Sequence, residues 1–224
     1  MKKKLSLEKL LTVIYYTSNR ENEAFEKKIR DKLLKTIGDI PLISVSQKPI
    51  DFGKNICVGD VGVSNQNVGR QIQIGAEAAT TPFIIMAEAD CIYPKEYFSF
   101  VPPRDDIAYR YDNLWILWKK GGPFRRKIYS ECGQVLGREY AIASLKNYCV
   151  GRGMWRADLE HGREVPPSPY SGGVVNTYQT NIPIINIKTD EGQHKSTRTM
   201  YNVEPVDSLP FWGTADEIRK EMFV

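Results

Sequence analysis

Short apolar runs alternate with amphipathic segments through the first part of the chain. Residues 10–16 (LLTVIYY) form an unbroken apolar and β-branched run, which is typical of a central strand buried on both faces. Residues 21–37 then place apolar side chains at three- and four-residue spacings, and Gly38 follows as a helix-ending glycine. Because a second apolar run at residues 41–46 comes directly afterwards, the pattern predicts a right-handed crossover between parallel strands.

A second helix and a third strand continue this pattern. Residues 67–79 predict a helix with an apolar inner face, and residues 82–86 (PFIIM) predict another buried strand. A short strand is also expected at residues 56–58, within a loop rich in Gly, Pro, Asn and Asp. The alternation favours the α/β fold class, with a mostly parallel central sheet flanked by helices.

The second half of the chain has shorter and less regular segments. We expect an aromatic turn or helix at residues 93–100 and strands at 107–111 and 114–118, the second followed by a hairpin through the Gly-rich residues 121–123. A short helix at residues 138–147 and one further strand at 182–187 follow. From residue 165 onward we expect an extended tail rich in Pro and Gly. Because the chain contains no internal repeat, residues 1–224 are expected to form a single domain.

The composition is that of an ordinary soluble globular protein. Apolar residues make up 42% and charged residues 26% of the chain, which argues against disordered, collagen-like and coiled-coil classes. The four cysteines lack the spacing of a zinc site or a disulfide framework, so a reducing compartment fits them. With no signal-peptide pattern and no apolar stretch that a bilayer would accept, we expect a cytoplasmic protein (in the host cytoplasm if it is viral) without a membrane span.

Two carboxylates follow the third predicted strand. Glu88 and Asp90 are two residues apart, and open α/β sheets bind their ligands at this end of their strands. Side chains with this spacing point the same way and can hold one oxygen-seeking divalent cation, which would bridge the phosphates of a nucleotide. The alternative is a pair of strand-end carboxylates that bind no ligand.

Five segments resemble the motifs of one enzyme family. They are TSNR at residues 17–20, NVGRQ at 67–71, EAD at 88–90, GQVLGR at 133–138 and ADLE at 157–160. Their order looks like that of family 2-like glycosyltransferases of the GT-A fold, in which a P-T-Y-N-R-like turn, an N-x-G-x-x-x-A-type helix, D-x-D, G-x-x-x-G-R and E-D follow one another. The resemblance implies a Rossmann-like, nucleotide-sugar-binding half at residues 1–92 and an acceptor-side half at residues 93–224.

The resemblance also implies a donor site. A nucleotide-diphosphate sugar, with a UDP-sugar as the leading candidate, would contact the set Thr17, Asn19, Arg20, Ser46, Gln47 and Gln71. Mn²⁺ or Mg²⁺ would bind Glu88 and Asp90 on the diphosphate, and His194 from the C-terminal tail would complete its ligands, unless that histidine is simply exposed to solvent. The neighbouring Lys195 and Arg198 suit diphosphate oxygens.

The catalytic base and the donor nucleotide are less well defined by the motifs. Asp158 would deprotonate the acceptor hydroxyl, but Ala157 replaces the first acid of the family's E-D pair, so Glu160 is the alternative base. The family's acidic D-D-x-S-x-D segment is replaced by SQKP at residues 46–49, which leaves the selectivity for the nucleotide open.

The acceptor side is rich in aromatic and basic residues. Residues 115–129 interleave both kinds and include Arg125 and Arg126, an arrangement that can follow a phosphate backbone and stack on bases. Trp155 and Tyr170 offer further aromatic faces to a sugar ring or an exposed base. The alternative for residues 115–129 is an amphipathic hairpin with core aromatics and solvated charges.

These features together predict a metal-dependent glycosyltransferase of the hexosyltransferase class. It would transfer a sugar to a hydroxyl group of a saccharide or of a hydroxymethylated pyrimidine in phage-type DNA. A nucleotidyltransferase is the alternative enzyme, although residues 17–20 lack the glycines of a phosphate-binding loop. A non-enzymatic nucleic-acid-binding module is the third hypothesis, since the net charge of +4 permits a polyanionic partner.

Overall fold

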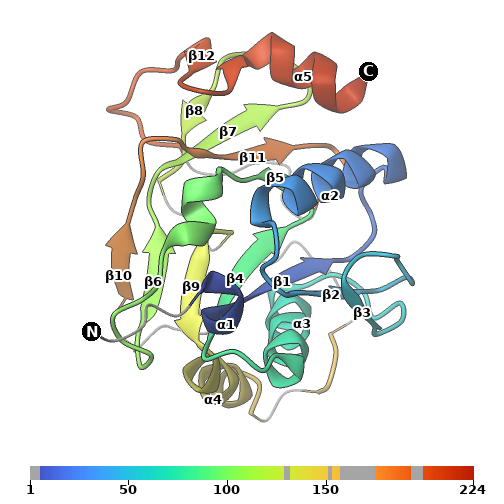
Figure 1. Ribbon diagram of the computed structural model, residues 1–224. Coiled ribbons are helices and arrows are strands. Elements are labelled where there is room, and N and C mark those ends of the chain that lie inside the picture. Colours follow the sequence, from blue (N-terminus) through green and yellow to red (C-terminus); the bar gives the residue numbers. More distant parts are fainter. Residues whose placement is uncertain (1–5, 129–131, 151–152, 157–174, 193–198) are drawn as a thin grey trace.

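A mostly parallel sheet forms the centre of the protein. The structure, a computed structural model, describes the whole chain except residues 1–5, 129–131, 151–152, 157–174 and 193–198. The strands of the central sheet are β1 (Leu11–Thr17), β2 (Leu42–Ser46), β3 (Lys54–Cys57), β4 (Phe83–Glu88), β6 (Ala108–Tyr111), β9 (Gln134–Gly137) and β10 (Val175–Tyr178). Their order is β10-β6-β9-β4-β1-β2-β3 (Figure 1). Strands β4, β1, β2 and β3 run parallel, whereas β9 is antiparallel to both β4 and β6. The predicted α/β class is confirmed.

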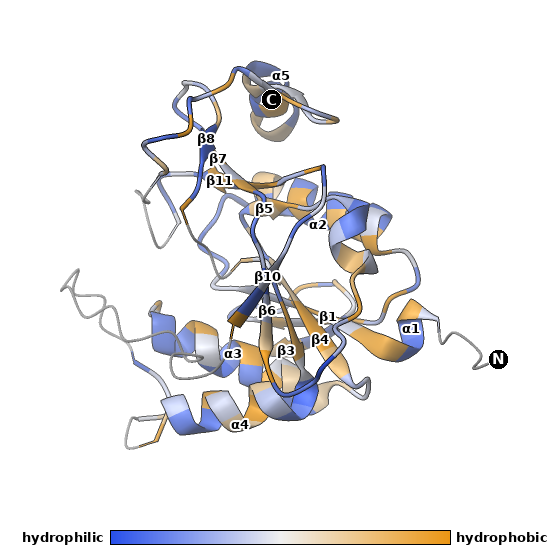
Figure 2. Cartoon of the chain, turned by 90° about the vertical axis from the view of Figure 1, so that its left-hand side faces the viewer, coloured by the Kyte–Doolittle hydropathy of each residue, from blue (hydrophilic) through white to orange (hydrophobic). Residues whose placement is uncertain are grey.

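Helices cover both faces of this sheet. The helices of the described residues are α1 (Leu7–Leu10), α2 (Glu23–Ile37), α3 (Asn65–Ala78), α4 (Arg138–Tyr148), α5 (Ala215–Phe223) and the 3-10 helix η1 (Lys95–Ser99). Helices α3 and α4 lie on one face and α2 on the other, with the apolar strands between them (Figure 2). Among the described residues, no helix is long and apolar enough to cross a membrane.

The burial of β1 explains its unbroken apolar sequence. Its side chains alternate between the two faces, so Val13 and Tyr15 join the core cluster that contains α2, while Ile14 and Tyr16 join the cluster that contains α3. Every residue of β1 is buried. A strand covered on both faces needs apolar residues at consecutive positions, which is the pattern that predicted it.

A second sheet extends the molecule beyond the carboxyl end of β4. It has the order β5-β11-β7-β8 and consists of β5 (Cys91–Ile92), β11 (Ile184–Lys188), β7 (Leu114–Trp118) and β8 (Arg125–Arg126). The predicted hairpin is confirmed, because β7 pairs with β8 in antiparallel fashion. Since β5 begins directly after Asp90, this sheet brings β11 next to the carboxylates that end β4.

The C-terminal tail differs from the extended segment that was expected. It contains the pair β12 (Ser208–Leu209) and β13 (Gly213–Thr214), followed by α5, which lies over the second sheet (Figure 1). Thr214 and Glu217 form a capping box at the start of α5. The T-x-x-E spacing of such a box is present in the sequence, but the prolines and glycines that precede it favoured an extended tail over a helix.

The glycines of the GQVLGR segment are required for close packing. A Cβ atom at Gly137 would overlap the carbonyl oxygen of Asp105, and one at Gly133 would lie 2.9 Å from the Cβ atom of Tyr111. Both glycines therefore let neighbouring segments approach β9.

Candidate functional site

The carboxyl ends of three parallel strands meet at one edge of the central sheet. Thr17 at the end of β1 pairs in register with Ser46 at the end of β2, and Tyr16 pairs with Glu88 at the end of β4. The structure thus brings the expected donor-binding positions Thr17 and Ser46 beside the expected acidic position Glu88. In open α/β folds this edge is where ligands bind.

Asn19 connects the turns that follow β1 and β2. Its side-chain oxygen accepts hydrogen bonds from the backbone nitrogens of Gln47 at 2.9 Å and Lys48 at 2.8 Å. Its own backbone nitrogen donates to the hydroxyl of Thr17 at 2.9 Å. Asn19 has a φ of 54°, a left-handed conformation that asparagine adopts more readily than most residues. Arg20, the next residue of the turn, is exposed.

The buried amides of Gln47 and Gln71 hold the surrounding loops. Gln47 donates from Nε2 to the carbonyl oxygen of Gly62 at 2.6 Å and accepts from the backbone of Val61 at 3.3 Å. Gln71 donates to the carbonyl oxygens of Thr17 at 2.8 Å and Val45 at 3.0 Å. Both side chains therefore hold the segments at this edge of the sheet by hydrogen bonds to backbone atoms.

The two carboxylates beyond β4 have different surroundings. Glu88 Oε1 accepts a hydrogen bond from the hydroxyl of Tyr16 at 2.7 Å. Asp90 Oδ2 lies 3.2 Å from the ammonium nitrogen of Lys188, whose side chain is 10% exposed. The thiol of Cys91 donates to Asp90 Oδ1 at 3.3 Å. Each carboxylate is thus engaged by the protein itself.

These surroundings separate the acidities of the two groups. Burial raises the pKa of Glu88 to about 8, with further contributions from Cys132 and Asp90. Burial alone would also raise the pKa of Asp90, but the ammonium groups of Lys188 and Lys127 lower it below its ordinary value. Near neutral pH, Glu88 is therefore largely protonated and Asp90 is ionised.

Glu21 is a third carboxyl group in this region, and the motifs did not single it out. Burial raises its pKa to about 7. The hydroxyl of Thr189 lies 2.9 Å and 2.7 Å from the two oxygens of this carboxyl group. Lys188 is the last residue of β11 and Thr189 follows it, so the end of the predicted strand at residues 182–187 was the available sequence signal.

Among the described residues, Asp90 already pairs with an ammonium group. Carboxylate oxygens suit Mn²⁺ and Mg²⁺, yet Asp90 Oδ2 lies 3.2 Å from the ammonium nitrogen of Lys188. The predicted third ligand, His194, lies outside the described residues. The metal site at Glu88, Asp90 and His194 therefore stays a prediction.

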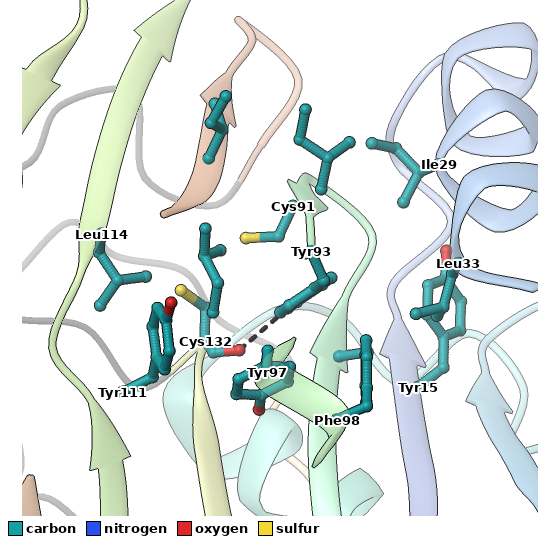
Figure 3. Close-up of a cluster of buried hydrophobic side chains, with 14 of the residues drawn as sticks. Tyr15, Ile29, Leu33, Cys91, Tyr93, Tyr97, Phe98, Tyr111, Leu114 and Cys132 are labelled. Carbon is teal, nitrogen blue, oxygen red and sulfur yellow. Dashed lines mark hydrogen bonds between the residues drawn. The ribbon is translucent and has the colours of Figure 1, made fainter. Parts of the chain in front are cut away.

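A second group of side chains that could hold a metal ion includes Glu88 and two cysteines. The ligand atoms of Glu88, Cys91 and Cys132 are all within 4.8 Å of one another. The two cysteines lie close together among buried tyrosines, and the hydroxyl of Tyr93 donates to the carbonyl oxygen of Cys132 at 2.9 Å (Figure 3). Burial raises the pKa of the Cys91 thiol, which keeps it protonated and weakens it as a ligand.

Several basic side chains of residues 115–129 contact the protein itself. Arg126 donates to the carbonyl oxygen of Leu114 at 3.0 Å, and Lys120 pairs with Asp190 at 3.0 Å. The ammonium of Lys119 lies 5.2 Å from the ring centre of Phe223, whereas Arg125 is exposed. These contacts favour the amphipathic hairpin over a surface devoted to nucleic acid.

The segment that carries Trp155 is attached to the start of α3. Asn67 accepts from the backbone nitrogen of Arg156 at 2.8 Å and donates to its carbonyl oxygen at 2.9 Å. The same amide donates to the carbonyl oxygens of Val61 at 2.7 Å and Gly62 at 3.0 Å. Trp155 is thereby held near the loop that Gln47 supports. The remaining predicted site residues, all outside the described part of the chain, are Asp158, Glu160, Tyr170, Lys195 and Arg198.

Comparisons with known proteins give similarity at the level of structure. No protein-family model and no curated protein sequence matches the chain. Residues 1–349 of S. aureus TarS, in a complex with UDP-GlcNAc, align with a TM-score of 0.53 and 10% identity over 85% of this chain and 62% of that one. This chain thus spans less than two thirds of the TarS chain that it matches.

A second solved structure matches over nearly the full length of both chains. The inositol-1-phosphate CTP transferase from T. maritima aligns with a TM-score of 0.51 and 8% identity, over 96% of this chain and 95% of that one. Identities this low establish the arrangement of the elements and leave the reaction open. The chain has a mixed α/β, Rossmann-like fold of the GT-A type.

Proposed function

We propose that the chain is a glycosyltransferase that moves a sugar from a nucleoside diphosphate to a hydroxyl group. The supporting observation is the convergence, at the carboxyl edge of a GT-A-type sheet, of the turns after β1 and β2 with the Asp90–Lys188 pair. The turns would hold the nucleoside, and the charged pair would meet its diphosphate. The UDP-GlcNAc complex of TarS supports a UDP-sugar as the donor, and thereby the hexosyltransferase class.

The donor site would use two kinds of residue. Asn19, Gln47 and Gln71 keep the loops in place through their backbone hydrogen bonds, so the nucleoside would meet a preformed surface. Thr17, Ser46 and Arg20 complete the proposed contacts with the nucleoside. Lys195 and Arg198 of the tail remain proposed contacts of the diphosphate, beside the Asp90 corner.

The acceptor would be activated by a carboxylate shortly after residue 156. The hydroxyl oxygen attacks the anomeric carbon, its proton passes to Asp158, and the bond to the diphosphate breaks with its electron pair. Asn67 anchors the chain at Arg156, close to the proposed nucleoside loops. Trp155, Tyr170, Arg125 and Arg126 remain the proposed acceptor contacts, for a saccharide or a hydroxymethylated pyrimidine in DNA.

A donor screen tests this proposal. Purified protein is mixed with UDP-, GDP-, CDP- and dTDP-sugars, and the melting temperature and the release of nucleoside diphosphate are measured. We expect one base, uracil first, to raise the melting temperature, because a ligand that binds only the native state stabilises it. If no nucleotide sugar changes the melting temperature or is cleaved, the proposal is wrong.

Nucleotidyl transfer is the second candidate, since the T. maritima enzyme matches this chain over almost its whole length. Such an enzyme would transfer the nucleoside monophosphate unit of a nucleoside triphosphate to a phosphorylated acceptor and release pyrophosphate. The turn at residues 17–22 contains no glycine, which disfavours a phosphate-binding loop there. Pyrophosphate release from CTP or UTP with a sugar phosphate, without cleavage of nucleotide sugars, would select this candidate.

A further inference from the structure

Strand pairing fixes Lys188 beside Asp90. Lys188 is the last residue of β11, which pairs with β7 on one side and β5 on the other. The backbone nitrogen of Ile187 donates to the carbonyl oxygen of Asp90 at 2.7 Å. The adjacent Lys188 therefore reaches the Asp90 carboxylate because of the backbone register, with its side chain 10% exposed. Ordinary surface ion pairs lack this enforced placement.

Lys127 brings a second ammonium group to the same corner. It donates to Asn186 Oδ1 at 3.2 Å, and Asn186 in turn donates to the sulfur of Cys91 at 3.2 Å. Asn186 is fully buried between Lys127 and the residue that follows Asp90. Two ammonium groups thus accompany Asp90, the ionised carboxylate of this corner, so the protein supplies the positive charge there by itself.

This positive charge opposes a divalent cation at Asp90. A cation that approached this carboxylate would have to displace the Lys188 ammonium, which would then lie buried without its partner. A diphosphate has the opposite requirement, since it needs positive charge that is already in place and shielded from water. The arrangement therefore suits an anion better than a metal ion.

We infer that Lys188, held by Asp90, is the cation that binds the diphosphate of the donor and neutralises it as it leaves, in place of a divalent metal. This inference rests on the proposed function. When the bond from the anomeric carbon to the diphosphate oxygen breaks, its electron pair adds one negative charge to the nucleoside diphosphate. Lys188 meets that charge, while the acceptor oxygen forms the new bond and its proton goes to the catalytic carboxylate. Asp90 acts as a positioning residue.

Titration calorimetry with nucleoside diphosphates tests the role of Lys188. UDP, with GDP, CDP and dTDP as alternatives, is titrated into the wild type in EDTA and then in MnCl₂, and into Lys188→Met, Lys188→Arg and Lys120→Met. We expect the wild type to bind equally well in both buffers, and Lys188→Met to bind about tenfold or more weakly in EDTA. Lys188→Arg should retain most of the affinity. Lys120→Met is the matched control, because Lys120 is 76% exposed and pairs with Asp190.

Binding of the metal alone gives a second readout. Mn²⁺ titrated into the wild type should produce no binding heat, whereas Lys188→Met frees the Asp90 carboxylate and should gain a Mn²⁺ site. If Lys188→Met unfolds, the pair Lys188→Met with Asp90→Asn removes both charges and should still lose the metal-independent binding of UDP.

The outcomes separate this inference from the proposed function. Nucleotide binding that requires Mn²⁺ in the wild type and persists in Lys188→Met with Mn²⁺ would overturn the role of Lys188 and leave the glycosyltransferase proposal intact. If none of the nucleotides binds in either buffer, the proposed function fails and the inference fails with it.

Discussion

The hydroxyl of Tyr16 donates a hydrogen bond to Glu88 Oε1 at 2.7 Å, and the two residues pair in register on the neighbouring strands β1 and β4. This contact holds the Glu88 side chain at the edge of the sheet, where it is largely removed from water. Burial raises the pKa of Glu88 from its ordinary 4.5 to about 8. The native state therefore keeps a proton on Glu88 that the unfolded chain has already released.

Glu88 should make the stability of the protein depend on pH. Because its pKa is raised in the native state, its contribution is complete below pH 4.5, falls as the pH rises, and levels off above about 8. Glu88→Gln stays neutral and should be more stable than the wild type at the alkaline end, by at most about 1.4 kcal/mol for each unit of pKa shift. Urea unfolding across this range measures the difference between the two proteins, in which the similar effect of Glu21 cancels. If the unfolding free energies of the wild type and Glu88→Gln changed with pH in parallel, the role of Glu88 would be contradicted.

Asp90 should be essential for turnover. Asp90→Ala removes the partner that holds Lys188 in place, so we expect the rate of glycosyl transfer to fall about a hundredfold or more. The rate is measured as release of nucleoside diphosphate under saturating donor. Asp106→Asn is a suitable control, since Asp106 pairs with Arg104 on an exposed part of the surface. Near-normal turnover in Asp90→Ala would show that the site lies elsewhere.

The Asp90–Lys188 pair should also show strong energetic coupling. Either single change, Asp90→Asn or Lys188→Met, leaves one charge buried and should lower the unfolding free energy by about 3 kcal/mol, whereas the double variant should recover much of this loss. The same cycle at Arg104 and Asp106 should give a coupling of at most about 1 kcal/mol, because that pair is exposed. Denaturant unfolding measures both cycles, and equal couplings would contradict the enforced pairing.

The central sheet could be predicted from the sequence because its signals are local. The apolar runs of β1, β2 and β4 are short and continuous, and amphipathic helical segments separate them. Each strand can therefore be recognised from a few consecutive residues. The strand ends then place Thr17, Ser46 and Glu88 at one edge without further information. The fold and the strand-end residues of the candidate site can therefore be predicted from local sequence.

The partner of Asp90 could not be predicted in the same way. Lys188 lies 98 residues further along the chain, and its proximity depends on the pairing of β11 with β5 and β7. Nothing in the local pattern distinguishes a lysine at a strand end that meets a carboxylate from one that meets water. The roles of Asn19, Gln47 and Gln71 were concealed for the same reason, because their amides bind the backbone of distant loops.

Asn19 should influence donor binding more than the chemical step. Asn19→Ala removes the acceptor for two backbone hydrogen bonds and places alanine at a φ of 54°, so we expect a loss of about 1–3 kcal/mol in unfolding free energy. Because the turns after β1 and β2 would separate, the KM for the donor should rise more than kcat falls. Asn19→Gly relieves the backbone strain of the alanine variant but does not restore the two hydrogen bonds. It should therefore be more stable than Asn19→Ala while its KM for the donor stays raised. An unchanged donor KM in both variants would exclude these turns from the nucleoside site. Asn202→Ala, at an exposed asparagine, is the control.

Asp158 and Glu160 are distinguished by which substitution slows the reaction without weakening donor binding. Arg156 is anchored to α3 through Asn67, close to the proposed nucleoside loops, and Asp158 is nearer to Arg156 in sequence than Glu160 is. A residue that only removes a proton from the acceptor contributes nothing to the affinity for the donor. Asp158→Asn should therefore lower kcat about a hundredfold or more and leave the Kd for UDP unchanged. Calorimetry and steady-state rates on Asp158→Asn and Glu160→Gln measure the two quantities separately. If Glu160→Gln is the slow variant and Asp158→Asn is not, the base is Glu160.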